Sequence, residues 1–136
     1  MIDQIELPQM VRMRHHRPAS RLDDPESAAK EALLKADVRQ WVKPGARIAV
    51  GCGSRGIAGY AQIVRGVLQA LKEVGAQPMV IPAMGSHGGA TAEGQIQVLA
   101  AAGITEESME VPIASGMDVV QIGTIPGGPP VYFDRR

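Results

Sequence analysis

Apolar positions along the chain fall into short runs and periodic segments that predict strands and helices in alternation. The runs RIAVGC at 47–52 and QPMVIPA at 77–83 lead into glycine-rich loops and predict two buried strands. Between them, apolar residues of the segment 60–74 recur at helical spacing, which predicts an amphipathic helix that Gly75 ends. Strands joined through a helix in this way are typical of a right-handed crossover in a parallel sheet.

The segment TAEGQIQVLAAAG at 91–103 predicts a second crossover helix after the second strand. Thr91 is the expected N-cap of this helix, and Gly103 is the expected C-cap. Its inward face is expected to carry Ile96, Leu99 and Ala100.

The N-terminal residues 1–24 are predicted to form an extended arm, because HHRPASRLDDP is polar, broken by proline and without a period. Asp24 and Pro25 then supply an N-cap and a first helical residue. The helix is expected to continue to about residue 42, where KPGAR stops it. Its inward positions are expected to be Ala29, Leu33, Val38 and Trp41.

The order of elements predicts that residues 25–136 form one α/β domain, Rossmann-like and three-layered, with a mostly parallel sheet and helices on both faces. The segment 104–113 leads into a third apolar run. The last two strands, at 118–123 and 130–133, are expected to pair antiparallel at an edge. Because ligands bind outside the carboxyl ends of parallel strands, Arg55 and His87 are expected to face one crevice.

Composition narrows the function classes. The formal net charge is zero, with 14 basic and 14 acidic residues, so no field of one sign attracts nucleic acid or an anionic membrane. No apolar run approaches the length of a membrane span, and the first residues do not form a secretory signal. The single cysteine excludes an internal disulfide and a cysteine metal cluster, which fits a cytoplasmic protein.

The first glycine loop, GCGSRG at 51–56, matches the dinucleotide pattern G-x-G-x-x-G between a strand and a helix. A dinucleotide site also needs an acidic residue near the end of the second strand, and VIPAMGSH contains none. The loop can instead bind a phosphate or carboxylate through its amides and the Ser54 hydroxyl. Arg55 adds a planar fork suited to such an anion, although a solvated arginine in a tight turn is the competing interpretation.

The second glycine loop places His87 between Ser86 and Gly88, at the end of a strand. An imidazole exchanges protons near neutral pH, which suits a general base, whereas the competing interpretation is an exposed structural histidine. Cys52 is interpreted as a packing residue rather than a nucleophile. The adjacent His15 and His16 lack a third ligand and are interpreted as solvated.

The two loops together carry a resemblance to a known family. The stretch GSRGIAGYAQIVRGVLQALKEVGAQPMVIPAMGSHGGATAEGQIQVL resembles the N-terminal domain of the nickel-dependent lactate racemase (LarA-like) family. The loop PAMGSHGGAT is the specific part, and SRGI alone is weak. The similarity continues through GITEESMEVPIASGMDVVQIGTIPGGPPVYFDR, so it covers nearly all of the chain beyond the arm.

The resemblance implies an isomerase that interconverts stereoisomers of a 2-hydroxy acid with a nickel pincer nucleotide. It implies that His87 is a catalytic base and that Arg55 holds the substrate carboxylate, with Ser54 also in contact with substrate. It implies loop contacts to the cofactor at Gly85, Ser86 and Gly88.

Departures from the family leave alternatives open. Cys52 stands where the lactate enzymes carry an aspartate, which leaves the identity of the 2-hydroxy acid open. The residues that tether the cofactor, ligate nickel and supply a second catalytic histidine belong to a later part of the family sequence. The chain alone is therefore expected to lack nickel and activity, and to need a C-terminal domain in the same or a separate chain. The alternative is a non-catalytic module that binds a small anion or phosphate.

Overall fold

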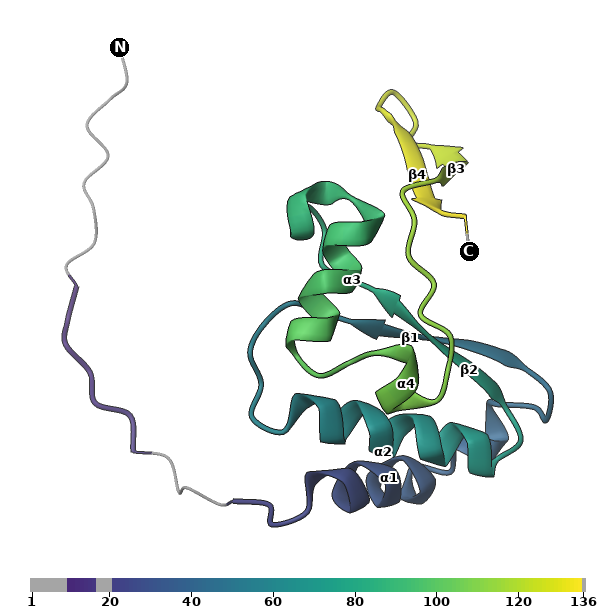
Figure 1. Cartoon of the computed structure of the whole chain (residues 1–136). Helices are drawn as coiled ribbons and strands as arrows, with labels where there is room; N and C mark the ends of the chain where they lie inside the picture. Colours follow the sequence, from purple (N-terminus) through teal and green to yellow (C-terminus); the bar gives the residue numbers. More distant parts are fainter. Residues whose placement is uncertain (1–9, 17–20, 136) are drawn as a thin grey trace.

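The fold is that of a computed structural model, which describes residues 10–16 and 21–135. Part of the predicted arm, residues 1–9 and 17–20, lies outside the described residues, and residues 10–16 contain no helix or strand. Within the described ranges, no helix is both long and apolar enough to cross a membrane. The elements in chain order are α1 (Pro25–Lys35), the 3₁₀ helix η1 (Val38–Gln40), β1 (Arg47–Cys52), α2 (Tyr60–Glu73), β2 (Gln77–Pro82), the 3₁₀ helix η2 (Gly88–Ala90), α3 (Ala92–Ala101), α4 (Glu106–Met109), β3 (Val119–Thr124) and β4 (Pro130–Asp134) (Figure 1).

The central sheet is parallel, as the alternation of strands and helices predicts. β1 pairs with β2 in a register that runs from Arg47 opposite Gln77 to Cys52 opposite Pro82. The third predicted strand is reduced to one parallel bridge between Val80 and Ile113. Two hydrogen bonds hold this bridge: the Val80 amide donates to the Pro112 carbonyl, and the Ala114 amide donates to the Val80 carbonyl, both at 2.9 Å. β2 therefore lies between β1 and the short segment around Ile113.

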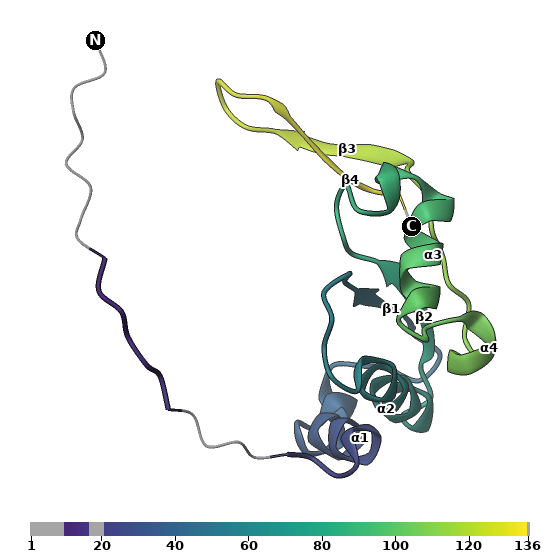
Figure 2. The ribbon, with the colours of Figure 1, turned by 60° about the vertical axis from the view of Figure 1, so that its left-hand side comes forward.

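The core lies on one face of this sheet. In β1, Ile48, Val50 and Cys52 turn toward the helices, whereas the alternate residues Arg47, Ala49 and Gly51 are exposed. One cluster joins Cys52 and Val80 of the strands to residues of three helices, namely Val64, Leu68, Leu99 and Met109. The mixed α/β class is confirmed, but the described helices do not cover both faces of the sheet (Figure 2). Successive right-handed crossovers that advance in one direction place their helices on the same face, which explains the difference.

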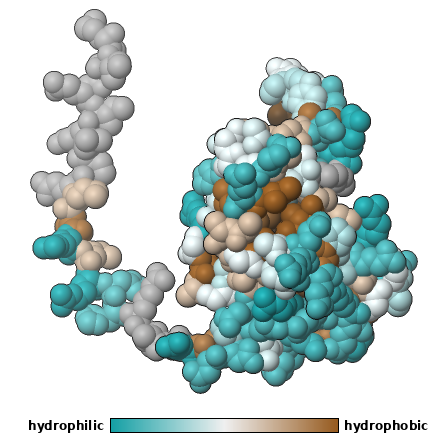
Figure 3. Space-filling view, in the orientation of Figure 1, coloured by the Kyte–Doolittle hydropathy of each residue, from teal (hydrophilic) through white to brown (hydrophobic). Residues whose placement is uncertain are grey.

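The two C-terminal strands form a hairpin of their own. β3 and β4 pair antiparallel, as predicted, but they form a separate two-stranded sheet rather than an edge of the parallel sheet. Every residue of both strands is exposed, including Ile122 at 63% and Phe133 at 65%. Hydrophobic residues also gather on the surface below the hairpin (Figure 3).

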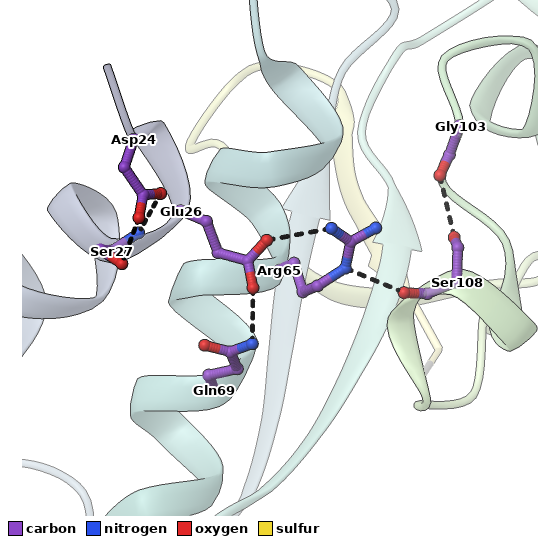
Figure 4. A network of polar contacts seen from close by, with 7 residues as sticks. All are labelled: Asp24, Glu26, Ser27, Arg65, Gln69, Gly103 and Ser108. Carbon is purple, nitrogen blue, oxygen red and sulfur yellow. Dashed lines mark hydrogen bonds and ion pairs between the residues drawn. The ribbon is translucent and has the colours of Figure 1, made fainter. Parts of the chain in front are cut away.

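Helices α1 and α2 pack closely through a small residue and a polar network. A Cβ added at Gly66 would lie 2.1 Å from the carbonyl oxygen of Glu26, so only glycine allows this approach. The Glu26 carboxylate bridges the helices by accepting hydrogen bonds from Arg65 at 3.0 Å and Gln69 at 2.7 Å. The Arg65 Nε also donates to the Ser108 carbonyl at 3.1 Å, which ties α2 to α4 (Figure 4).

The helix ends follow the predicted capping residues. Asp24 accepts hydrogen bonds from the Ser27 hydroxyl at 2.6 Å and from its amide at 3.0 Å, and these bonds lower the pKa of the Asp24 carboxyl. Thr91 caps α3 by accepting from the Gly94 amide at 3.1 Å. Gly75 and Gly103, with positive φ angles, follow the ends of α2 and α3 as predicted.

Three predicted inward positions are wrong. α1 ends at Lys35 because Asp37 adopts a left-handed conformation with φ of 53°, so the helical register does not extend to Trp41, which is 78% exposed. In α3, Leu99 is fully buried, but Ile96 is 41% exposed and Ala100 is exposed. The buried residues of α3 are Gln95 and Leu99: Leu99 joins the core cluster with Val80 and Met109, and Gln95 contacts the second loop.

Candidate functional site

The loops that follow β1 and β2 meet at the carboxyl ends of the two strands, as the parallel arrangement predicts (Figure 1). The Ala83 amide donates to the Cys52 carbonyl at 2.8 Å and continues the pairing into the loops. Beyond this point, the Ser54 hydroxyl forms a hydrogen bond with Nδ1 of His87, 33 residues away in sequence. The two loops are therefore joined by their side chains as well as by their backbones.

The joined loops line a cleft of about 410 Å³ that contains both residues of the predicted crevice, Arg55 and His87, together with Ser54. Tyr60 and Met84 contribute to the same lining. A cleft of this size is at the small end of ligand pockets. The geometry thus brings a guanidinium, a hydroxyl and an imidazole to one small cavity.

The Arg55 side chain is available for a ligand. Within the described part of the chain, its guanidinium takes part in no hydrogen bond or ion pair. A second hollow of about 440 Å³ lies along the same loop and includes Arg55 and the first residues of α2, Tyr60 to Gln62. The N-cap of α2 is Gly59, and no side chain caps this helix. Uncapped amides at a helix N-terminus and a guanidinium both favour a bound anion.

The second loop is held in place by two residues of α3 that the sequence did not indicate as site residues. The side chain of Gln95, only 6% exposed, donates to the Gly85 carbonyl at 2.9 Å. Gly88 and Gly94 approach so closely that a Cβ on Gly94 would lie 1.9 Å from the Gly88 carbonyl oxygen. The sequence signal for this contact is Gln95 itself, a polar residue on the inward face of an otherwise apolar helix. These contacts fix the loop that carries His87.

The three predicted cofactor contacts do not line the cleft that contains His87. Gly85 accepts the hydrogen bond from Gln95, and Gly88 packs on α3 with φ of 67°. Ser86 is exposed, and its carbonyl accepts from the Ala90 amide at 3.1 Å. Gly85 and Gly88 are thus both held by contacts with α3. Contact of Gly85, Ser86 and Gly88 with a cofactor stays a prediction.

Cys52 lies beneath the first loop and is fully buried. Burial raises the pKa of its thiol, and burial together with the neighbouring Cys52 raises the pKa of the Tyr60 phenol. The Tyr60 hydroxyl also reaches the Gly53 carbonyl at 3.4 Å. A buried thiol with a raised pKa has little thiolate and is a poor nucleophile, which supports its interpretation as a packing residue.

Cys52 should therefore resist alkylation in the native protein. Because labelling requires local opening, even an opening free energy of about 2 kcal/mol slows the reaction roughly 30-fold relative to the unfolded chain. The measurement is the rate of iodoacetamide incorporation by intact mass, which is unambiguous because the chain has one cysteine. The same protein in guanidinium chloride is the control. Equal rates in both samples would contradict the buried position.

The described residues do not form a metal site. They contain no group of three or more His, Cys, Asp or Glu side chains that could hold a metal ion. His15 and His16 are both exposed in the segment 10–16.

The dinucleotide pattern also lacks its usual geometry. Gly51 belongs to β1, and α2 begins at Tyr60, four residues after Gly56, so the glycines do not open directly into the helix. No acidic residue stands at the end of β2.

Comparison of this chain with protein-family models, with curated proteins and with solved structures finds no match.

Proposed function

We propose that this chain is the substrate-binding and proton-relay part of a 2-hydroxy acid racemase or epimerase. The observation that carries the proposal is the hydrogen bond between Ser54 and His87, which holds an imidazole beside Arg55 in one small cleft. The resemblance to the nickel-dependent lactate racemase family supports the same assignment. A cytoplasmic location belongs to this proposal and is supported by the single buried thiol.

The residues of the cleft have complementary roles in this proposal. The Arg55 guanidinium binds the substrate carboxylate through paired hydrogen bonds, because its planar fork matches that group. His87 then accepts the proton of the 2-hydroxyl group as a general base. Inversion at the α-carbon also needs an acceptor for the α-hydrogen, which would leave as hydride; the cofactor implied by the resemblance would supply that acceptor. In this proposal, the polypeptide that completes the site binds the cofactor.

Exposed apolar surface supports the need for further polypeptide. The β3–β4 hairpin presents Ile122 and Phe133 to solvent, and an isolated two-stranded hairpin is marginally stable in water. The exposed face of β1 lacks a covering layer among the described residues. A C-terminal domain, in the same or a separate chain, would cover such surfaces and complete a three-layer Rossmann-like arrangement.

Arg55→Ala should weaken binding of lactate, the probe for this site, by about 10- to 150-fold, the effect of a charge-assisted hydrogen bond worth about 1.5–3 kcal/mol. Stability should be unchanged because the side chain has no partner within the described ranges. The measurement is a titration followed by amide chemical shifts. Arg47→Ala, at the opposite end of β1, is the matched control. Equal affinity in Arg55→Ala and wild type, or no binding to wild type, would contradict the carboxylate site.

A non-catalytic anion-binding module is the second candidate, because the uncapped N-terminus of α2 and Arg55 share the second hollow. Titration with inorganic phosphate separates the two candidates. Phosphate binding that shifts the amides of Ala61 and Gln62, with no response to lactate, would favour the module. A lactate response at Ser54 and His87 would favour the racemase part.

A further inference from the structure

We infer that Ser54 is a positioning residue that sets the tautomer of His87. In this inference, the hydroxyl oxygen accepts the Nδ1–H of the imidazole, which leaves the lone pair of Nε2 free to accept a proton. This inference rests on the proposed role of His87 as a general base and adds a residue that makes the base competent.

The contact is held from both sides by backbone and buried groups. The His87 amide donates to the Met84 carbonyl at 3.2 Å, and Met84 itself is buried. On the other loop, the Gly53 carbonyl beside Ser54 accepts from the Tyr60 hydroxyl. The two side chains therefore meet on loops whose backbones are anchored independently, so their contact is a property of the fold rather than of one loop.

The position of Ser54 determines which nitrogen can act. Because Ser54 covers Nδ1, Nε2 is the ring nitrogen left to meet a substrate. If the Ser54 hydroxyl donated to Nδ1, then Nε2 would carry the proton and could not accept another. If it accepts instead, its own hydrogen is free to donate to the substrate carboxylate beside Arg55. Only the second arrangement makes His87 a base.

In many catalytic sites, a carboxylate accepts the ring N–H of the histidine and orients the imidazole. Ser54 takes that position beside His87. Among the residues that the structure describes, the side chains lining this cleft include Arg55, Tyr60 and Ser54 but no Asp or Glu. The orienting group is thus a neutral hydroxyl, which fixes the ring without placing a negative charge beside the substrate carboxylate.

The test is long-range ¹H–¹⁵N correlation NMR on the ¹⁵N-labelled chain, at a pH where the imidazoles are neutral. The chain has three histidines, and the spectrum of His87→Gln assigns the signals of His87. We expect Nδ1–H in His87, in contrast to the Nε2–H form that a free imidazole prefers. Ser54→Ala should shift the tautomer ratio toward Nε2–H by about 2- to 12-fold, and Ser54→Thr, which keeps the hydroxyl, should restore it.

Two results would overturn the inference: Nε2–H as the main form in wild type, or an unchanged ratio in Ser54→Ala. A conserved amide spectrum in Ser54→Ala shows that the loops are intact, so a tautomer change is not a loss of fold. The outcome is separable from the proposed function. Arg55 binds a carboxylate with either tautomer, so the lactate titration can succeed when this test fails. A Ser54-dependent tautomer without lactate binding would reject the proposed function alone.

Discussion

Replacing His87 with alanine should lower the rate of stereoinversion of a 2-hydroxy acid by about 10²–10⁴, the usual contribution of a general base. His87 lies on the exposed side of the second loop, and its ring bonds only with Ser54 among the described residues. Removing the ring therefore takes away the proton acceptor without opening the core. The fold and the lactate affinity supplied by Arg55 should remain.

The rate is measured by chiral chromatography of one lactate enantiomer incubated with the complete enzyme, this chain together with the polypeptide that supplies the cofactor. His16→Ala is the matched control, because it removes an exposed imidazole from the segment 10–16. A loss under tenfold in His87→Ala would show that another group accepts the hydroxyl proton. An equal loss in His16→Ala would point to a general effect on folding.

The meeting of the two loops could be predicted from sequence because it depends only on strand order. Two runs joined by one helix give parallel neighbours, and parallel neighbours bring their carboxyl ends together. Arg55 and His87 follow those ends directly, so they line the same cleft in the structure. Helix caps at Asp24 and Thr91 were equally predictable, since their hydrogen bonds are local in sequence.

Features that depend on distant packing could not be predicted. Whether helices cover one face of the sheet or both depends on the order in which successive strands are added to the sheet. A single sequence does not specify that order. The contact between Ser54 and His87 depends on the rotamers of two loop tips, 33 residues apart. Extending the helical period past Asp37 predicts an inward Trp41, but the left-handed conformation of Asp37 ends that period.

The close packing of Gly88 against Gly94 holds the loop that carries His87 on α3. Gly94→Ala tests this contact. In an exposed helix this change would stabilise the helix by roughly 1 kcal/mol. Here the new Cβ would lie 1.9 Å from the Gly88 carbonyl oxygen and 2.8 Å from the Thr91 hydroxyl that caps α3. Because backbone cannot give way cheaply, we expect a loss of about 3 kcal/mol in the free energy of unfolding, the upper end of the usual range for overpacking.

Urea unfolding followed by circular dichroism measures the loss, and Gly56→Ala is the control, since nothing lies within 4 Å of its added Cβ. The control should change stability by less than about 1 kcal/mol. If the loop moves to relieve the clash, His87 moves with it, and the NMR signature of its contact with Ser54 should weaken in Gly94→Ala. Unchanged stability in Gly94→Ala would show that the second loop is not packed on α3. The position of His87 would then depend on the Ser54 contact rather than on the fold beneath it.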